Sequence, residues 1–383
     1  MLQHDLDAII FANLENVLYV SGFFNPVQEA RPTELNTFYV YKKGFKPAVV
    51  IAGASIGLIN ALDENVDVIP FAAFPIQGCL ENVAVKDQRA VDAVNRCVDS
   101  EEAAVFLLLN QGGDKAPVRR IGVDFTSSSW IAFHAISLAA PTDVAFVDIQ
   151  PLIAKRRMVK RPEEIKLIRE AAHIAEQSFI TVLPHVIAGV TERELHRFYE
   201  MEVVSRGGSP FFAIIGINEH GAYPNWTPGD TAVKPGDVIR FDIGCKYCNY
   251  CADIARTVVL GPVKPKYVEY YNAVLAGYEA ALSIVKPGVK ASDVFRTGES
   301  AVHCFGLKEF RRLHCGHTIG LNLYEGLLIA PNDDRELEAG MTFCLEIPFY
   351  PFGEAGIQLE NMILVTENGY KVLNTIPNHM FVL

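Results

Sequence analysis

The stretch IRFDIGCKYCNYCADIARTVVLG, residues 239–261, decides the fold, because two apolar, strand-like runs in it flank a short polar turn. Each run carries one acid, Asp242 in the first and Asp253 in the second. Residues that lie opposite each other in an antiparallel hairpin have their side chains on the same face. Asp242 and Asp253 are opposite if the turn is centred between Tyr247 and Cys248. The stretch therefore predicts a hairpin with both carboxylates on one face.

A second stretch, CLEIPFYPFGEAGIQLENMILV at residues 344–365, repeats this pattern. Glu346 and Glu360 are opposite each other if its turn is centred on Gly353, and glycine suits a turn because it tolerates positive φ. Each acid again lies in an apolar run, where a lone carboxylate would be costly to bury. With His317 in HCGHTIGL, the acids make a five-ligand metal site of four carboxylates and one imidazole. Two divalent ions would balance the four charges, which indicates a paired-metal hydrolytic centre.

Any one of these acids could instead form an ion pair with an arginine or a lysine, as most strand-end carboxylates do. Two same-face pairs in apolar strands, with a histidine in a glycine-rich segment between them, favour the metal site over ion pairs. The sequence thus predicts that all five residues converge.

A C-x-x-C-x-x-C pattern at Cys245, Cys248 and Cys251 suggests an iron–sulfur or zinc site. The pattern falls inside the first hairpin, where alternate residues point to opposite faces and a common focus is awkward. No fourth cysteine follows at a fitting distance. We therefore interpret the three as small buried or turn residues.

Composition and charge are those of a globular protein. The chain of 383 residues is 50% hydrophobic and 21% charged, and its length favours two domains over one. A formal net charge of −11 argues against a nucleic-acid partner, which would require a basic face. The apolar runs are too short to span a membrane, and the start MLQHDLDAIIFANL lacks the basic region of a signal peptide. We expect a cytoplasmic protein with its eight cysteines reduced.

We predict two domains, residues 1–156 and residues 157–383. The first alternates candidate strands (DAIIFA, TFYVYK, PAVVIAG, VDVIPF, RIGVDF and VAFVDI) with segments near 54–63, 86–98 and 127–139 that look helical. This alternation predicts an α/β domain with a mixed sheet. Because it carries no obvious chemical motif, we expect a structural or dimer-forming role for it.

The second predicted domain combines helices with the two acid-bearing hairpins. Helices are expected from Pro162, from Thr191 with a capping box, over KPKYVEYYNAVLAGYEAALSIV, and from about residue 292. AGVTERELHRFYE (188–200) and PGVKASDVFRTGE (287–299) form a weak repeat, and each follows a long helix and precedes an acid-bearing strand pair. We therefore predict an α+β domain made of a duplicated unit, with its halves related by a pseudo-two-fold axis.

These residues, in this order, resemble the metallopeptidase family of aminopeptidase P, prolidase, creatinase and methionine aminopeptidase, which has the pita-bread fold. FDIGCKYCNYCADIART is similar to the family's Asp-x-Gly segment followed by Asp-x-x-Arg-Thr, and GHTIGLNLYEG to its Gly-His-x-x-Gly-Leu segment. LEAGMTFCLEIPFY and IQLENMILVTENG are similar to its two glutamate strands, and KRPEEIKLIREAAHIAE to its opening helix. NVLYVSGF matches the N-terminal domain of the creatinase and prolidase branch, so the resemblance covers nearly the whole chain.

The resemblance implies a role for each residue of the predicted metal site. Asp242 would chelate one of two divalent ions, Asp253 and Glu360 would bridge both, and His317 and Glu346 would complete the second ion's ligands. Water activated between the ions would be the nucleophile, and Glu346 would pass its proton to the leaving nitrogen. Oxygen ligands with one imidazole suit manganese, our first expectation, or zinc, cobalt or iron. The resemblance also implies a homodimer.

Four positions around this site depart from the pattern of the prolidase-like peptidases. Asn225, Leu313 and Tyr324 stand where histidines are common, although His314 lies next door, and Gln358 stands where an arginine is common. Asparagine, tyrosine and glutamine can hydrogen-bond but cannot carry the proton traffic of an imidazole. We take Asn225 and Tyr324 as candidate substrate-binding residues.

The leading hypothesis is a dinuclear-metal hydrolase acting on a C–N (amide or peptide) bond in a small substrate, with an Xaa-Pro dipeptidase or aminopeptidase as the default. The alternative is a non-peptidase hydrolase or lyase acting on a small non-peptide metabolite, because the four positions changed together. A third hypothesis is a non-catalytic binding module, which would be expected to lose metal ligands. His220 fits either a cleft wall or a solvated loop, and we favour the loop.

Overall fold

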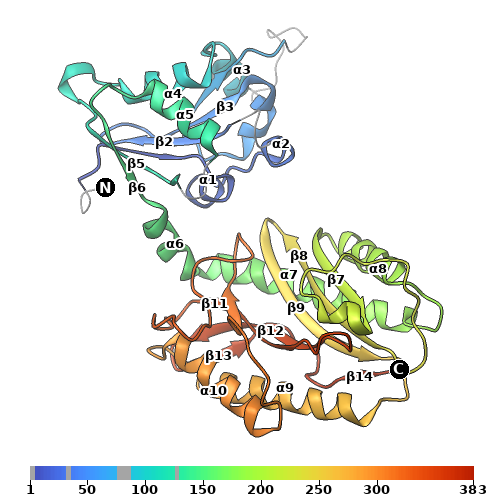
Figure 1. Ribbon diagram of the computed structural model, residues 1–383. Coiled ribbons are helices and arrows are strands. Elements are labelled where there is room, and N and C mark those ends of the chain that lie inside the picture. The colour runs from blue at the N-terminus through green and yellow to red at the C-terminus, as the bar shows by residue number, and fades with distance from the viewer. Residues whose placement is uncertain (1–4, 32–35, 76–87, 126–128) are drawn as a thin grey trace. The chain divides into compact units, whose positions relative to one another are not determined.

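Figure 1 shows the computed structural model of the protein, in which the chain forms two compact units, Met1–Ile153 and Ala154–Leu383. The structure describes residues 5–31, 36–75, 88–125 and 129–383. Helix α6 (Gln150–Met158) contains the boundary between the units. Among the described residues, no helix is both long and apolar enough to cross a membrane.

The first unit is built on a six-stranded sheet with the order β4-β3-β2-β1-β5-β6. Its strands are β1 (Ala8–Phe11), β2 (Phe38–Lys42), β3 (Ala48–Ala52), β4 (Asp67–Phe71), β5 (Arg120–Val123) and β6 (Ala145–Asp148). Strand β1 pairs antiparallel with β2 and parallel with β5, so the sheet is mixed, as predicted. Each strand lies inside one of the six predicted segments, because a short apolar run bounded by turn residues is a strong local signal.

Helices cover both faces of this sheet. One apolar cluster contains side chains of α4 (Glu101–Leu109) and α5 (Trp130–Ala139), and a separate cluster contains side chains of α1 (Leu14–Ser21) and α3 (Gln88–Val94). The short helix α2 (Pro26–Ala30) follows α1. The segment predicted near 54–63 forms 3₁₀ turns over Gly53–Ala61 instead of an α-helix. The starts of the other two predicted helices, residues 86–87 and 127–128, lie outside the described residues.

The second unit is an α+β domain with an eight-stranded sheet. Its strands are β7 (Ser209–Ile217), β8 (Val238–Tyr247), β9 (Tyr250–Val259), β10 (Gly316–Thr318), β11 (Thr342–Phe349), β12 (Ile357–Thr366), β13 (Gly369–Val372) and β14 (Phe381–Val382). The main path is β10-β11-β12-β9-β8-β7, with β13 added to β12 and β14 to β9. The path has three antiparallel strands on each side of the β12–β9 junction, which is the duplicated arrangement that we predicted.

Helix pairs precede each set of three strands. They are α7 (Pro162–Val182) with α8 (Glu192–Ser205), and α9 (Pro265–Ser283) with α10 (Ala291–Cys304). The predicted capping box at Thr191 is present, since the Glu194 amide donates to the Thr191 hydroxyl and the Thr191 amide donates to the Glu194 carboxylate. Helix α7 packs on β8 and β9, and α9 packs on β11 and β12 (Figure 1).

Packing of the helices determines which face of the sheet is free for chemistry. The Phe179 ring of α7 lies 5.3 Å from the Phe241 ring of β8, centroid to centroid. Successive residues of a strand point to opposite faces, so the neighbouring Asp242 points away from α7. The acids therefore belong to the face that the helices do not cover.

Candidate functional site

The β11–β12 hairpin has the predicted register. Glu346 lies directly opposite Glu360. The connection between the strands contains Gly353, which has a φ of 76°. A positive φ of this size is easily adopted by glycine, which explains why this turn was recognisable in the sequence.

The predicted register of the β8–β9 hairpin is wrong. Asp242 lies opposite Ala255 rather than opposite Asp253. The turn residues are Cys248 and Asn249, with φ values of 46° and 69°, so the turn is centred one residue later than predicted. Moving a turn centre by one residue changes each pairing by two residues, which leaves side-chain parity intact. Both acids therefore still share a face, as diagonal neighbours.

One cavity of about 420 Å³ in the second unit collects the predicted site residues. Its lining includes all five predicted metal ligands, both predicted substrate-binding residues, and further polar side chains: Asp242, Asp253, His317, Glu346, Glu360, Asn225, Tyr324, Arg312, His314 and Tyr350. The four acids come from the neighbouring strands β8, β9, β11 and β12. His317 comes from β10. Convergence thus follows from the sheet order and from shared parity.

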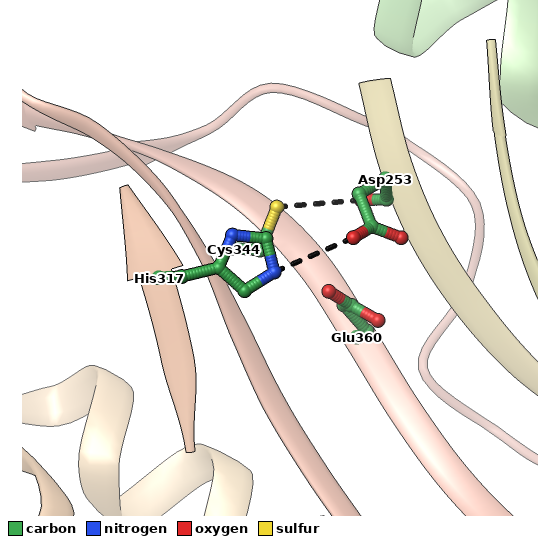
Figure 2. Close-up of side chains that lie close together, drawn as sticks. All are labelled: Asp253, His317, Cys344 and Glu360. Carbon is green, nitrogen blue, oxygen red and sulfur yellow. Dashed lines mark hydrogen bonds and ion pairs between the residues drawn. The ribbon is translucent and has the colours of Figure 1, made fainter. Parts of the chain in front are cut away.

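His317 joins the acids because β10 pairs with β11. In Figure 2 the His317 ring faces the carboxylates of Asp253 and Glu360. The Nε2 atom of His317 lies 3.4 Å from Oδ2 of Asp253. All three side chains are almost completely buried.

The buried acids have fewer partners than their charges require. Asp253 Oδ1 and Glu360 Oε1 are buried and have no hydrogen-bond partner in the structure. Burial raises the pKa of Asp242 to about 7, with Asp253 adding to the rise against the opposing charge of Arg240. Burial and the neighbouring carboxylates raise the pKa of Glu360 well above its usual value. Unpaired oxygens and mutually repelling acids are the features that a bound divalent cation would remedy, so these residues fit such an ion.

Glu346 differs from these acids, because nearby polar groups stabilise its ionised form. His314 Nδ1 lies 3.2 Å from Oε1 of Glu346. Gln358 Nε2 donates to Oε2 of Glu346 at 3.3 Å and to Oε2 of Glu360 at 3.2 Å. Burial opposes its ionisation, but His314, other nearby cationic groups and hydrogen bonding lower the pKa of Glu346 overall. The cavity therefore contains one carboxylate that stays ionised beside others that resist ionisation.

Two of the four departures noted in the sequence need correction. Leu313 is 88% exposed and does not line the cavity, whereas its neighbour His314 does, so the histidine is displaced by one residue rather than lost. Gln358 lies beside Arg240, whose Nη1 donates to Oε1 of Gln358 at 3.2 Å. Arg240 Nη1 also lies 3.4 Å from Oδ2 of Asp242. An arginine is therefore next to the acids, but it comes from β8 and not from β12.

Sequence reasoning missed Arg240, although a signal was present. Arg240 is completely buried, and its guanidinium donates to Tyr350 Oη at 2.7 Å and to the carbonyl oxygen of Tyr223 at 2.7 Å. It lies two residues before Asp242 on the same face of an apolar strand. A charged residue in such a run requires a partner, and the only question is which one.

The loop that carries Asn225 is tied to a buried acid. Glu192 at the start of α8 accepts hydrogen bonds from Trp226 Nε1 and from the Gly229 amide, both at 2.9 Å. His220 Nδ1 lies 2.8 Å from the same carboxylate, and its ring stacks on Trp226 with centroids 3.9 Å apart. The interpretation of His220 as a solvated loop residue is therefore wrong: it helps to fix the loop that brings Asn225 to the cavity.

Tyr324 packs against His317, the histidine of the predicted metal site. Its ring stacks on His317 with centroids 3.8 Å apart and an interplanar angle of 22°. The next residue, Glu325, is buried and accepts a 2.9 Å hydrogen bond from Lys160 Nζ as well as a bond from Arg157. Burial and the surrounding acids raise the pKa of Tyr324, so its hydroxyl remains a neutral donor.

The C-x-x-C-x-x-C cysteines do not converge. Cys245 Sγ donates to the carbonyl oxygen of Ala171 on α7, and Cys251 Sγ donates to that of Leu321. Cys248 is exposed in the turn. The interpretation of these residues as buried or turn cysteines agrees with this geometry. None of the cysteines that the structure describes forms a disulfide.

A different cysteine, Cys344 on β11, was not singled out in the sequence. Asp253, His317, Cys344 and Glu360 each offer one potential ligand atom, and these atoms all lie within 4.8 Å of one another. Its signal was available, because Cys344 precedes Glu346 by two residues and must share its face.

Comparison with known sequences gives a family match over much of the second unit. The model of metallopeptidase family M24 matches residues 166–367. A Staphylococcus aureus protein described as an uncharacterized peptidase is 32% identical over 231 residues, which make up 60% of this chain. The match spans 66% of that relative's length, just under two thirds.

Solved structures match nearly the whole chain. An X-Pro aminopeptidase from Thermotoga maritima has a TM-score of 0.81 at 25% identity, covering 99% of this chain and 98% of that one. An Xaa-Pro dipeptidase from Bacillus anthracis has a TM-score of 0.82 at 22% identity, covering 100% and 96%. These matches confirm the predicted fold, a mixed-sheet α/β domain followed by a pita-bread α+β domain.

Proposed function

Because this chain belongs to metallopeptidase family M24, we propose that it is a dinuclear-metal hydrolase that cleaves a C–N bond in a small substrate. The observation that carries the proposal is the convergence of four buried or nearly buried carboxylates and one imidazole on a single cavity. Buried oxygens of Asp253 and Glu360 have no hydrogen-bond partner there, which supports a cation between them.

The proposed ligands are Asp242, Asp253, His317, Glu346 and Glu360, with Asp253 and Glu360 shared between two ions. When bound, divalent ions supply Lewis acidity and lower the pKa of a water molecule that attacks the substrate. The donor set of oxygens with one imidazole suits manganese first, and also zinc, cobalt or iron.

Glu346 is the proposed proton carrier. Its lowered pKa leaves it ionised and able to accept a proton from the attacking water. Glu346 then passes this proton to the leaving nitrogen. His314, 3.2 Å away, and Gln358 hold the carboxylate in one orientation for both transfers. Asn225 and Tyr324 line the same cavity, and the Asn225 amide and the neutral hydroxyl of Tyr324 are the groups that we propose to hydrogen-bond the substrate.

The position of Arg312 suggests that the substrate has a free carboxylate, which Arg312 would bind. It lines the cavity, and its guanidinium carbon lies 5.0 Å from the centroid of the Tyr350 ring. Its Nε is buried without a hydrogen-bond partner, although its charge helps to lower the pKa of Glu346. A guanidinium in a cavity pairs well with a carboxylate through two parallel hydrogen bonds. A cavity of about 420 Å³ suits a molecule the size of a dipeptide.

An Xaa-Pro dipeptide is the first candidate substrate, because the similar structure from Thermotoga maritima is that of an X-Pro aminopeptidase. The alternative, a small non-peptide carboxylate with a hydrolysable C–N bond, is favoured by one observation: Asn225 and Tyr324, rather than histidines, line the cavity. Such a substrate would satisfy Arg312 equally well.

The test is hydrolysis by the full chain after metal loading. We expect about two ions per chain, turnover of Xaa-Pro dipeptides with a free carboxylate, and much slower turnover of the same dipeptides as amides. The change Arg312→Gln should raise KM for the free acids and leave the amides unaffected, while Glu346→Gln removes turnover of both. Failure to bind any ion would refute the metal centre. Two bound ions without turnover of any dipeptide would favour the non-peptide substrate.

A further inference from the structure

We propose that Cys344 is an additional metal ligand, which gives the His317 end of the candidate metal site a sulfur donor. The proposal rests on the proposed function in one respect, the presence of a metal ion between the acids. It goes further by assigning a sixth residue to the site and by predicting which ions that end of the site prefers.

The position of Cys344 in the sheet brings its side chain to the site. Cys344 lies directly opposite His317 in the β10–β11 pair, and it precedes Glu346 by two residues on β11. Residues two apart on a strand share a face, so Cys344 and Glu346 both belong to the acid-bearing face. Figure 2 shows Cys344 gathered with Asp253, His317 and Glu360 from four different strands.

The donor atoms of these four side chains lie close enough together for small side-chain movements to bring them around one ion. One donor atom from each of the four side chains lies within 4.8 Å of all the others. Each of the four side chains is at least nine-tenths buried, with exposures of 4% for Asp253, 2% for His317, 0% for Cys344 and 1% for Glu360. His317 lies 3.4 Å from Asp253 and the Gln358 amide donates to Glu360, but each carboxylate keeps one buried oxygen without a partner, which a cation would satisfy.

The hydrogen bonds of the group leave its donors available. The sulfur of Cys344 contacts the backbone carbonyl oxygen of Asp253 at 3.7 Å, which is a weak interaction for a thiol. Asp253 Oδ1 and Glu360 Oε1 have no hydrogen-bond partner in the structure. Binding of an ion would replace the weak contact of the thiol by a sulfur–metal bond, with the thiol proton released to solvent.

A sulfur donor changes the expected metal preference. Thiolates are soft ligands that favour zinc, cobalt and cadmium, whereas manganese prefers oxygen. The Asp242 end of the site offers carboxylates only, so manganese suits that end. We therefore expect the His317 end to hold zinc or cobalt more tightly than manganese.

Cobalt(II) separates this proposal from the proposed function. In the full-length protein, visible d–d absorption reports an ion in the site, and a near-ultraviolet thiolate-to-cobalt charge-transfer band reports sulfur. We expect both signals in the unmodified protein. Visible bands without the ultraviolet band would overturn the role of Cys344 and leave the metal centre standing. Absence of both signals would overturn the metal centre itself.

The matched variants are Cys344→Ser and Cys251→Ser. Cys251 is also buried, and its sulfur likewise contacts a backbone carbonyl oxygen, at 3.5 Å. Cys344→Ser should keep the visible bands, lose the ultraviolet band and lower the preference for zinc over manganese by about tenfold or more. Cys251→Ser should change none of these. If Cys344→Ser fails to fold, X-ray absorption at the zinc edge of the unmodified protein decides the question, and zero sulfur neighbours would refute the proposal.

Discussion

The two acid-bearing hairpins reach the same cavity with different geometry. In β11–β12, Glu346 and Glu360 are directly opposite each other, whereas in β8–β9 the acids are offset, with Asp242 opposite Ala255. Both arrangements work because delivery to the cavity depends on side-chain parity and not on exact pairing. A shift of two residues along a strand is tolerated, and a shift of one would send an acid to the helix-covered face.

The hairpins also differ in how their acids are supported. In β8–β9, the buried guanidinium of Arg240 lies beside Asp242. In β11–β12, the neutral amide of Gln358 donates to both glutamates. One hairpin thus has a fixed positive charge within its own strands, whereas the other has a neutral amide, and the cationic groups near Glu346 lie outside that hairpin. This contrast predicts which changes unfold the protein and which only weaken metal binding.

The largest effect is expected from removing one shared ligand in each hairpin. Asp253→Asn and Glu360→Gln should each lose both ions and all measurable turnover, since each residue is proposed to bridge the ions. Metal content and hydrolysis of a dipeptide are the measurements. The metal-free Glu360→Gln protein should fold at least as stably as the unmodified metal-free protein, because a neutral amide relieves repulsion within the acid cluster. Retention of two ions by either variant would contradict the proposed sharing.

Arg240→Met should cause the next largest effect, and the effect should be on stability. The change leaves Asp242 without its positive partner and removes hydrogen bonds to Tyr350 and to the Tyr223 carbonyl. Breaking a buried ion pair from one side costs about 3–5 kcal/mol of unfolding free energy. Urea denaturation of the metal-free protein measures it. A loss below about 1 kcal/mol would mean that Arg240 is not the main support of this hairpin.

Gln358→Leu should mainly lower metal affinity. Gln358 is buried and has no charge to leave uncompensated, but its amide orients both Glu346 and Glu360. Loss of such an orienting group typically costs 10–100-fold in metal affinity, so we expect about that range. Competition with a chelator gives the affinity. If affinity stays unchanged while stability falls as much as in Arg240→Met, the contrast between the hairpins is wrong.

Metal removal should destabilise the protein more at pH 8 than at pH 6. Burial is the main cause that raises the pKa of Asp242, to about 7, without an ion. When the pKa of a carboxyl group is higher in the folded than in the unfolded protein, the free energy of unfolding falls as the pH rises from the unfolded pKa to the folded pKa. The metal-free protein therefore becomes less stable across this window, and bound ions cancel the loss. The difference in Tm with and without a chelator measures this, and an equal difference at both pH values would count against it.

The sequence predicted those parts of the site that depend on local parity. The four acids were predicted from apolar runs and His317 from a glycine-rich segment, and all five residues line the cavity. The register of β8–β9 was missed because cysteine is not a residue that favours positive φ, so Cys248 gave no turn signal. The error was harmless, since a two-residue shift preserves the face.

Residues whose role depends on distant packing were not predictable in the same way. His220 was assigned to a solvated loop because its partner, Glu192, lies 28 residues earlier on another element. His314 lines the cavity in place of Leu313. Which of two adjacent residues points into a cavity depends on the local direction of the backbone, and no sequence pattern predicts that direction. Arg312 has the same difficulty, because only the fold shows that its guanidinium enters the cavity.

The smallest effects concern the two turns, where the hairpins should respond with opposite signs. Gly353 has a φ of 76°, and a Cβ there would meet no other atom within 4 Å, so Gly353→Ala introduces backbone strain alone. It should lower the unfolding free energy by about 1 kcal/mol. Cys248 is exposed with a φ of 46°, and asparagine tolerates that conformation better, so Cys248→Asn should raise stability by roughly a few tenths of a kcal/mol. Cys304→Ser, at another exposed cysteine, is the control for loss of a surface thiol. Urea unfolding of the metal-free proteins compares all three, and the same sign at both turns would show that positive φ is not what distinguishes the hairpins.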